Sequence, residues 1–210
     1  MYLPEAIIDE FLAICQRMHM DYNLYESLFA ASDRNLELFV ATAPMLFEDL
    51  NRILIDHVLI QFGKITDPAK SGKKKTNLTT NYILEEISWP PDIHGRLVEI
   101  NGRLMDFRGQ IEAARSKRLA HIDLTAQLEQ QGPLGDFPPG HEKHFLNDLQ
   151  EFMDIAFGHF HDSEPCSISP SASTYTHGLI QALEKSRIFD VCGKCSPSER
   201  RLAAREYRNR

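Results

Sequence analysis

The sequence lacks the features that direct a protein to a membrane or to the secretory pathway. No apolar run among its 210 residues approaches the roughly 20 residues that span a bilayer. The first residues show neither a basic stretch nor a small-residue cleavage site. The four cysteines are scattered, so a disulfide framework is not expected. We therefore expect a cytoplasmic protein with reduced thiols and no membrane partner.

Several common catalytic signatures are also missing from the sequence. It contains no glycine-rich phosphate loop, no GxSxG, no HExxH and no convincing carboxylate pair. An excess of positive charge is missing too, because the formal net charge is −7. This balance argues against non-specific coating of nucleic acid, which needs clustered Lys and Arg. Positive charge is concentrated locally in residues 70–75, 103–118 and 194–210.

Apolar residues recur at helical spacing through the first third of the chain. Pro4 is typical of a first helical turn, and Ser32 or Asp33 can cap a second helix. Pro44 is expected to kink that second helix without ending it. The two predicted apolar faces are Ile7, Ile8, Phe11, Leu12, Cys15 and Met18 in the first helix, and Leu36, Phe39, Ala43, Leu46, Phe47, Leu50, Ile53, Leu54, Val58 and Phe62 in the second.

The middle of the chain predicts a loop and two further helices. Residues 63–77 read as an exposed basic loop, and Asn77 is expected to cap a short helix that the 89–91 Trp-Pro-Pro sequence ends. Asp92 is expected to cap the next helix, which carries an apolar seam at steps of three and four residues. That seam consists of Leu97, Ile100, Leu104, Phe107, Ile111 and Ala114, and the glycines at 95, 102 and 109 beside it suggest close approach of another helix.

After a Gly/Pro-rich loop at 131–140, Phe145, Leu149, Phe152, Met153, Ala156, Phe157 and Phe160 predict a helix with an aromatic core face. A Ser/Pro-rich linker follows, then a helix at 175–189 and a charged terminal helix at 198–210. The predicted fold class is all-α. We expect a helical bundle over residues 1–162, followed by a linker and a short helical C-terminal extension over 163–210.

The segment Arg115 to Asp123 carries the strongest chemical signal. At about 100° per residue, Arg115, Arg118 and His121 span an arc of roughly 120° on a helix, so two guanidinium groups and an imidazole can face one groove. This trio suits a phosphodiester, because arginine binds phosphate oxygens and histidine exchanges protons near neutral pH. Spacing alone also permits an alternative, in which Arg118 and His121 are interior residues paired with Asp106, Asp123 or a backbone carbonyl.

The same segment resembles the signature of the HEPN superfamily, in which an arginine precedes a histidine by four to six residues. Here five residues separate Arg115 from His121. The helix ending in the 62–67 sequence Phe-Gly-Lys-Ile-Thr-Asp and the Asn-Leu-Thr at 77–79 are similar to the AbiU-like branch, which is associated with abortive phage infection. The resemblance covers roughly residues 10–160, and the arginine-histidine segment is its only specific part.

The resemblance implies an HEPN-like helical bundle that acts as a homodimeric, metal-independent endoribonuclease without a cofactor, in phage defence or in a toxin-antitoxin system. It implies attack of a ribose 2′-hydroxyl on its phosphate, with Arg115 and His121 catalytic. Ser116 matches the polar residue that follows the family arginine, where many relatives have Asn or Asp, and is expected to bind substrate. From their positions alone, and not from the resemblance, Lys117 and Arg118 are expected to hold RNA and Asp123 to orient the imidazole. An antitoxin or regulatory protein is a further expected partner.

Two other functions remain open from the sequence. Branches of the superfamily use the bundle as a non-catalytic binding or sensing module, which the acidic net charge favours. Cys192 and Cys195 form a CxxC motif that supplies two of the four ligands a structural zinc usually needs. Cys166, His159, His161 or His177 are candidates to complete such a site.

Overall fold

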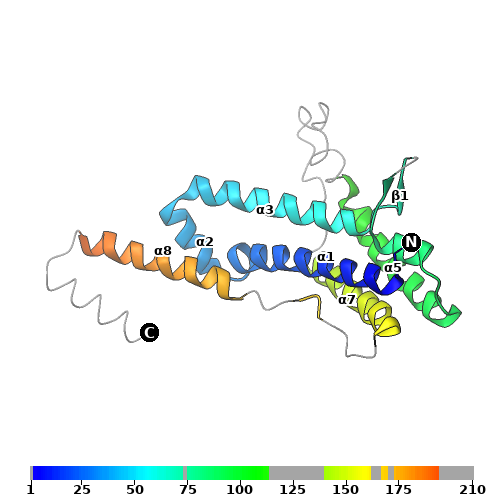
Figure 1. The fold of residues 1–210 in the computed structure, drawn as a ribbon. Coiled ribbons are helices and arrows are strands. Elements are labelled where there is room, and N and C mark those ends of the chain that lie inside the picture. Colours follow the sequence, from blue (N-terminus) through cyan, green and yellow to red (C-terminus); the bar gives the residue numbers. More distant parts are fainter. Residues whose placement is uncertain (1, 73–74, 114–139, 162–166, 170–172, 194–210) are drawn as a thin grey trace. The chain divides into compact units, whose positions relative to one another are not determined.

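The computed structural model describes residues 2–72, 75–113, 140–161, 167–169 and 173–193 (Figure 1). Helices hold 82% of the described residues, and the one sheet there has two strands of two residues each. An average globular protein has about a third of its residues in helices. The predicted all-α fold class is therefore confirmed. No helix in the described ranges is both long and apolar enough to cross a bilayer.

The chain divides into two compact units, whose boundaries fall within two of the long helices. Unit 1 comprises residues 1–22 and 54–170, and unit 2 comprises residues 23–53 and 171–210. Residues 23–53 thus group with the C-terminal helix of the described chain. The division at residues 162 and 163 that the sequence suggests stays a prediction.

Helix α1 (Pro4–Tyr25) confirms the first predicted helix, and it continues into a short π-helix, η1 (Glu26–Ala30). Its predicted apolar face is buried at Ile8, Phe11, Leu12, Cys15 and Met18. Ser32 caps helix α2 (Asp33–Thr42) as expected, because its hydroxyl accepts a hydrogen bond from the backbone nitrogen of Arg34.

The prediction of one kinked helix across Pro44 is wrong. Helix α2 ends at Thr42, and helix α3 (Pro44–Ile65) begins at the proline itself. Ala43 between them has φ −154° and ψ 72°, outside the helical region. The proline ring disfavours the helical conformation of the preceding residue, whereas proline fits the first position of a new helix. The break also changes the register, so Leu46 and Ile53 of the predicted stripe are 64% and 55% exposed.

The predicted loop at 63–77 is shorter and more ordered than expected. Helix α3 runs two residues past Gly63, and strands β1 (Lys70–Ser71) and β2 (Lys75–Thr76) pair as a small antiparallel hairpin. Strands this short leave no detectable alternation in the sequence. Asn77 does not cap helix α4 (Thr80–Glu86); the cap is Thr79, whose hydroxyl accepts from the nitrogen of Tyr82.

Helix α5 (Pro91–Ala113) and helix α7 (His141–Phe160) pack side by side (Figure 1). The described part of the predicted α5 seam is buried, from Leu97 to Ile111, and Ala114 lies outside the described residues. The helices run antiparallel, since Phe107 contacts Phe145 while Trp89, just before α5, contacts Phe160 at the end of α7. Asp92 lies within the first turn of α5 and not before it.

The expected close approach at the α5 glycines is wrong. A Cβ atom added at Gly95, Gly102 or Gly109 would meet nothing within 4 Å. These glycines lie on the exposed side of α5, so packing does not require them.

In unit 2, helix α8 (Ser173–Gly193) confirms and extends the predicted helix at 175–189, and it packs against α2. The terminal helix predicted at 198–210 lies outside the described residues.

Candidate functional site

Helix α5 enters the candidate site from a packed aromatic core in unit 1. Phe62 of α3 contacts Phe107 of α5 and Phe145 of α7, with ring centroids 5.8 and 4.8 Å away. Tyr22 of α1 lies 6.1 Å from Phe62 on the other side. Because these rings are nearly fully buried, they fix the C-terminal half of α5 against three other helices. Phe145 and Phe152 are buried, which confirms their prediction as packing residues.

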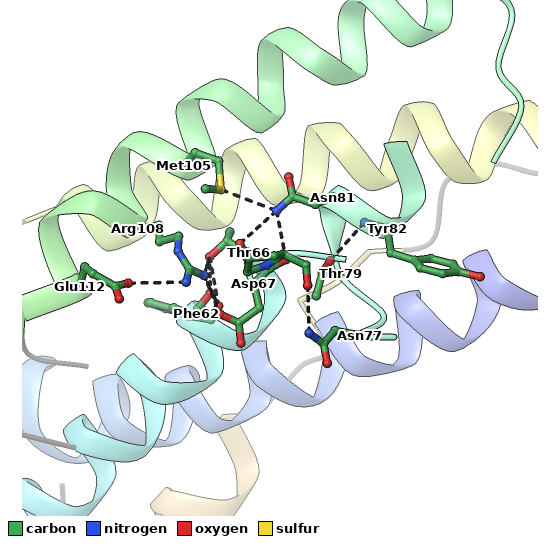
Figure 2. A network of polar contacts seen from close by, with 12 residues as sticks. Phe62, Thr66, Asp67, Asn77, Thr79, Asn81, Tyr82, Met105, Arg108 and Glu112 are labelled. Carbon is green, nitrogen blue, oxygen red and sulfur yellow. Dashed lines mark hydrogen bonds and ion pairs between the residues drawn. The ribbon is translucent and has the colours of Figure 1, made fainter. Parts of the chain in front are cut away.

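Arg108 ties α5 to the end of α3, as Figure 2 shows. Its Nη1 donates to the carboxylate of Asp67 at 2.8 Å and to the carbonyl of Gly63 at 2.9 Å. Its Nη2 lies 3.5 Å from Glu112 one turn further along α5. The Arg108 and Asp67 side chains are only 14% and 20% exposed. Two such shielded charges are stable only when paired and hydrogen-bonded, so this contact fixes where α5 passes the α3 terminus.

Asn81 of α4 extends the same network. Its side-chain nitrogen donates to the carbonyls of Thr66 and Asp67, at 3.1 and 3.0 Å. Its side-chain oxygen accepts from the Asn101 amide of α5 at 2.9 Å. Asn81 therefore supplies donors for two backbone carbonyls of the turn that follows α3. The network joins α3, α4 and α5 at the place where the β-hairpin leaves α3.

A second polar contact joins α5 to α7 near the surface. Arg103 donates from Nε to Asp148 at 2.7 Å and from Nη2 to Glu151. The hydrogen bond to Asp148 raises the pKa of the Arg103 guanidinium further above its ordinary value. Since this arginine is always charged in proteins, the shift has no consequence for proton transfer. The contact fixes the register of the two helices.

Unit 1 also contains a histidine-carboxylate pair that the sequence gave no reason to single out. The Nε2 of His57 on α3 lies 2.9 Å from Asp21 of α1, and Gln61 lies 3.2 Å from the same nitrogen. The pair is separated by 36 positions in the chain, so only the packing of α1 against α3 reveals it. A histidine oriented by a carboxylate can exchange protons, but among the described residues the polar contacts of His57 are with Asp21 and Gln61 and include no serine, cysteine or threonine nucleophile.

The predicted catalytic and RNA-binding residues lie outside the described residues. These are Arg115, Ser116, Lys117, Arg118, His121 and Asp123. Their roles stay predictions. The structure describes α5 up to Ala113, two residues before Arg115. The structure therefore shows the anchored helix that precedes the segment in the chain.

The candidate zinc ligands that the structure describes do not come together. His159 packs against Trp89, His161 lies 3.1 Å from Asp9, and His177 contacts Gln181 at 2.7 Å. In the described part of the chain, no three His, Cys, Asp or Glu side chains form a group that could hold a metal. The side chain of Cys192 and the whole of Cys166 and Cys195 lie outside the described residues. The zinc prediction at the CxxC stays untested.

Sequence reasoning missed the Arg108, Asp67 and Asn81 network. The partners lie 41 and 14 positions apart, so no local spacing rule links them. The sequence did contain one signal for it, since the charged residue Arg108 directly follows the buried seam residue Phe107 and so lies close to the packed face of α5.

No protein-family model, curated protein or solved structure matches this chain.

Proposed function

We propose that this chain is a metal-independent endoribonuclease of the HEPN type, which cleaves RNA and leaves a cyclic phosphate. The supporting observation is the Arg115 to His121 spacing, placed in the sequence directly after α5. That helix is held by the buried seam against α7 and by Arg108 at the α3 terminus. Catalytic groups must be held to within a fraction of an ångström. An anchored helix immediately before Arg115 in the chain supports such precise positioning.

The proposed chemistry needs only side chains of this chain and the substrate. The ribose 2′-hydroxyl attacks its own phosphorus while His121, or its counterpart in a second copy, takes the hydroxyl proton. The P–O5′ bond breaks, and the leaving oxygen receives a proton to become a 5′-hydroxyl. General acid-base catalysis of this kind contributes about 10²–10⁴-fold. Arg115 stabilises the negative charge that develops on the phosphorane oxygens.

Ser116, Lys117 and Arg118 would hold the RNA strand, and Asp123 would orient the imidazole of His121. A homodimer would bring two copies of the arginine-histidine segment together. The proposed setting is phage defence or a toxin-antitoxin system in the cytoplasm, with an antitoxin or regulatory protein restraining the activity. The homodimer, the setting and the partner rest on the resemblance of the 115–123 segment and of residues 62–67 and 77–79. The roles of Lys117, Arg118 and Asp123 rest on their positions beside Arg115 and His121.

The test compares wild-type protein with His121→Ala and Arg115→Ala on total RNA in the presence of EDTA. Fragment ends are examined for cyclic phosphate. His94→Ala is the matched control, because His94 lies exposed on the described part of α5, outside the arginine-histidine segment. We expect cleavage by the wild type and by the control, and a loss of at least about 100-fold in both active-site variants. A DNA strand of the same sequence should stay intact, because it lacks the 2′-hydroxyl.

Intact RNA in every reaction, with folding and oligomeric state confirmed, would contradict the enzyme. It would favour the second candidate, a non-catalytic binding or sensing module. The observation behind that candidate is the acidic net charge of −7, which is unusual for a protein that grips RNA over a broad surface.

A further inference from the structure

Three residues of the Ser/Pro-rich linker are docked on unit 1, where they contact both α1 and α7. They are Ser167, Ile168 and Ser169, and they belong to no helix or strand. Ile168 is fully buried, whereas the serines on either side of it are exposed. Removing an aliphatic side chain from water is favourable. Among the three docked residues, Ile168 therefore supplies the apolar part of the contact.

The peptide group between Ser167 and Ile168 is held from two sides. Its carbonyl oxygen accepts a hydrogen bond from the side-chain nitrogen of Gln16 on α1, at 3.1 Å. Its N–H donates to the side-chain oxygen of Gln150 on α7, at 2.8 Å. One backbone unit thus has its donor and its acceptor satisfied by side chains of two helices. Because both bonds are made to the backbone, they do not depend on which side chains the docked segment carries.

The two helices hold this site in a defined geometry. The side-chain nitrogen of Gln150 donates to Asp154, one turn further along α7, at 2.6 Å. An ionised carboxylate only accepts hydrogen bonds, so this contact determines which end of the Gln150 amide faces Ile168. Nearby, Phe11 of α1 meets Phe152 of α7 edge-on, with ring centroids 6.5 Å apart, and both rings are fully buried. A site fixed in this way loses little conformational freedom when a segment binds.

The docked segment also contains a local turn that favours a hydroxyl residue before the aliphatic one. The backbone nitrogen of Ser169 donates to the hydroxyl oxygen of Ser167 at 3.0 Å. Serine and threonine commonly bond in this way to the backbone two residues further on. The contacts together describe what the site recognises: a Ser or Thr, then a buried aliphatic residue, then a residue with an exposed side chain.

We propose that α1 and α7 form a peptide-binding site, which residues 167–169 occupy in this structure and from which an unstructured segment of a partner protein displaces them. The ligand class is a short peptide with an aliphatic side chain directly after Ser or Thr, and residues 167–169 are the observed example of it. Displacement is feasible because the contact consists of one buried side chain and one clamped peptide group.

The chemistry of the site favours a peptide from another protein. An enclosed aliphatic side chain and two neutral amides suit a peptide and not a chain of phosphates. A second copy of this chain has the matching segment, but that segment is already docked on its own α1 and α7. Exchanging segments between two copies would therefore replace each contact by an identical one. The inference does not depend on the proposed ribonuclease activity.

The test uses the full chain with its own segment weakened. Ile168→Ser removes the buried side chain and leaves Gln16 and Gln150 in place. The peptide Ala-Ser-Ile-Ser-Ala, acetylated and amidated at its ends, is added to isotope-labelled protein, and the backbone amide signals are followed by NMR. We expect saturable shifts centred on Gln16 and Gln150. The wild type should bind the peptide about threefold more weakly or worse, because its own segment competes at an effective concentration in the millimolar range.

Matched peptides and variants separate recognition from general stickiness. The peptide Ala-Ser-Ser-Ser-Ala lacks the aliphatic side chain and should give no saturable shift. Gln150→Leu, added to the Ile168→Ser chain, removes the acceptor for the peptide N–H and should weaken binding by about tenfold. Gln181→Leu makes the same change at an exposed position of α8, outside unit 1, and should leave the affinity unchanged. Circular dichroism checks that each variant keeps the wild-type helix content.

A measurement on the wild type keeps the test decisive if Ile168→Ser folds poorly. The Ile168 N–H is hydrogen-bonded while the segment is docked, so its exchange with deuterium reports on undocking. Excess Ala-Ser-Ile-Ser-Ala should speed exchange at this amide several-fold, and the serine peptide should not. Unchanged exchange with both peptides would contradict displacement.

The absence of saturable binding to a folded Ile168→Ser chain would overturn the proposal. Equal binding of both peptides, or unchanged affinity in the Gln150→Leu variant, would do the same. A wild type that dimerises as its concentration rises, while Ile168→Ser stays monomeric, would assign the site to a second copy and overturn the choice of partner. RNA cleavage is measured separately and tests Arg115 and His121, so either proposal can fail without the other.

Discussion

The α5–α7 pair buries its apolar side chains, whereas α2 and the first half of α3 leave several of theirs in solvent. Leu97, Leu104 and Ile111 of α5 are fully buried, but Val40, Met45 and Leu46 are between 64% and 79% exposed. Both regions are helical with apolar residues at regular spacing. The difference is that α5 has a full-length antiparallel partner. Apolar spacing thus makes a core only where another element covers it.

The α2–α3 region has a smaller core of its own. Phe39 and Phe47 stack across the break at Ala43, with ring centroids 4.0 Å apart, and Phe29 contacts Phe39 at 5.5 Å. Both Phe39 and Phe47 are buried. The break at Pro44 turns the two helices so that these rings meet, and it leaves the residues beside them exposed.

Matched leucine truncations give the largest contrast. Leu104→Ala in α5 should lower the free energy of unfolding by about 2–5 kcal/mol, because it removes buried apolar volume and leaves a cavity. Leu46→Ala in α3 should change it by less than about 0.5 kcal/mol, because that side chain is already 64% exposed. Urea denaturation of both variants checks this. Similar losses of stability in both variants would show that the Leu46 side chain is buried in solution. That result would contradict the contrast between α3 and α5.

Matched arginine truncations sharpen the comparison for charges. Arg108→Ala should cost roughly 3 kcal/mol, because it removes the ion pair that Arg108 makes with the shielded Asp67 carboxylate. Arg52→Ala removes an ion pair with Asp49 whose side chains are 57% and 66% exposed, so it should cost less than about 0.5 kcal/mol. The same denaturation experiment applies. A cost below about 1 kcal/mol for Arg108→Ala would show that the network does not anchor α5.

The dependence on alkaline pH tests the interior of unit 1. Burial raises the pKa of the Cys15 thiol above its ordinary value of 9.0, so only the unfolded chain loses this proton just above that pH. The stabilising effect is complete below pH 9.0 and is lost as pH rises, by up to about 1.4 kcal/mol per pH unit. Unfolding of wild type and Cys15→Ala is compared at pH 8 and pH 10. An equal pH slope in both proteins would refute this contribution.

The smallest effect is expected at the α2–α3 break. Pro44→Ala should lower stability by about 0.4–1 kcal/mol, because proline restricts the unfolded chain and fits the first turn of α3. Helix content should stay unchanged, because the Phe39–Phe47 stack holds the break. Pro4→Ala at the start of α1 is the matched control. A rise in the 222 nm signal of Pro44→Ala alone would show that proline is the sole cause of the break.

Local features of the sequence predicted much of the fold. The buried face of α1, the Ser32 cap, the α5 seam and the aromatic face of α7 depend on neighbours within one or two turns, so periodicity and capping preferences suffice for them. The break at Pro44 was misjudged because a kink and a break differ only in the conformation of Ala43. The cap of α4 is Thr79, two positions after Asn77. The side chain of Asn77 instead donates a hydrogen bond to the carbonyl of Pro68 in the preceding loop.

The candidate site was less accessible to prediction. The contacts that anchor α5 join residues far apart in the chain, and a sequence pattern does not encode which charged residue meets which. The β-hairpin escaped prediction because two-residue strands have no detectable alternation. The arginine-histidine segment itself is known here only by its spacing and its resemblance, so its geometry and role stay predictions.

Trp89 gives the molecule a built-in optical probe. It is the only tryptophan in the chain; its indole nitrogen donates to the carbonyl of Ile83, and its ring lies 5.4 Å from His159 and 5.3 Å from Phe160. Its emission therefore reports on the junction of α4, α5 and α7 in unit 1, while circular dichroism averages over all helices. Two melting curves that fail to coincide would reveal that unit 2 unfolds as a separate cooperative block.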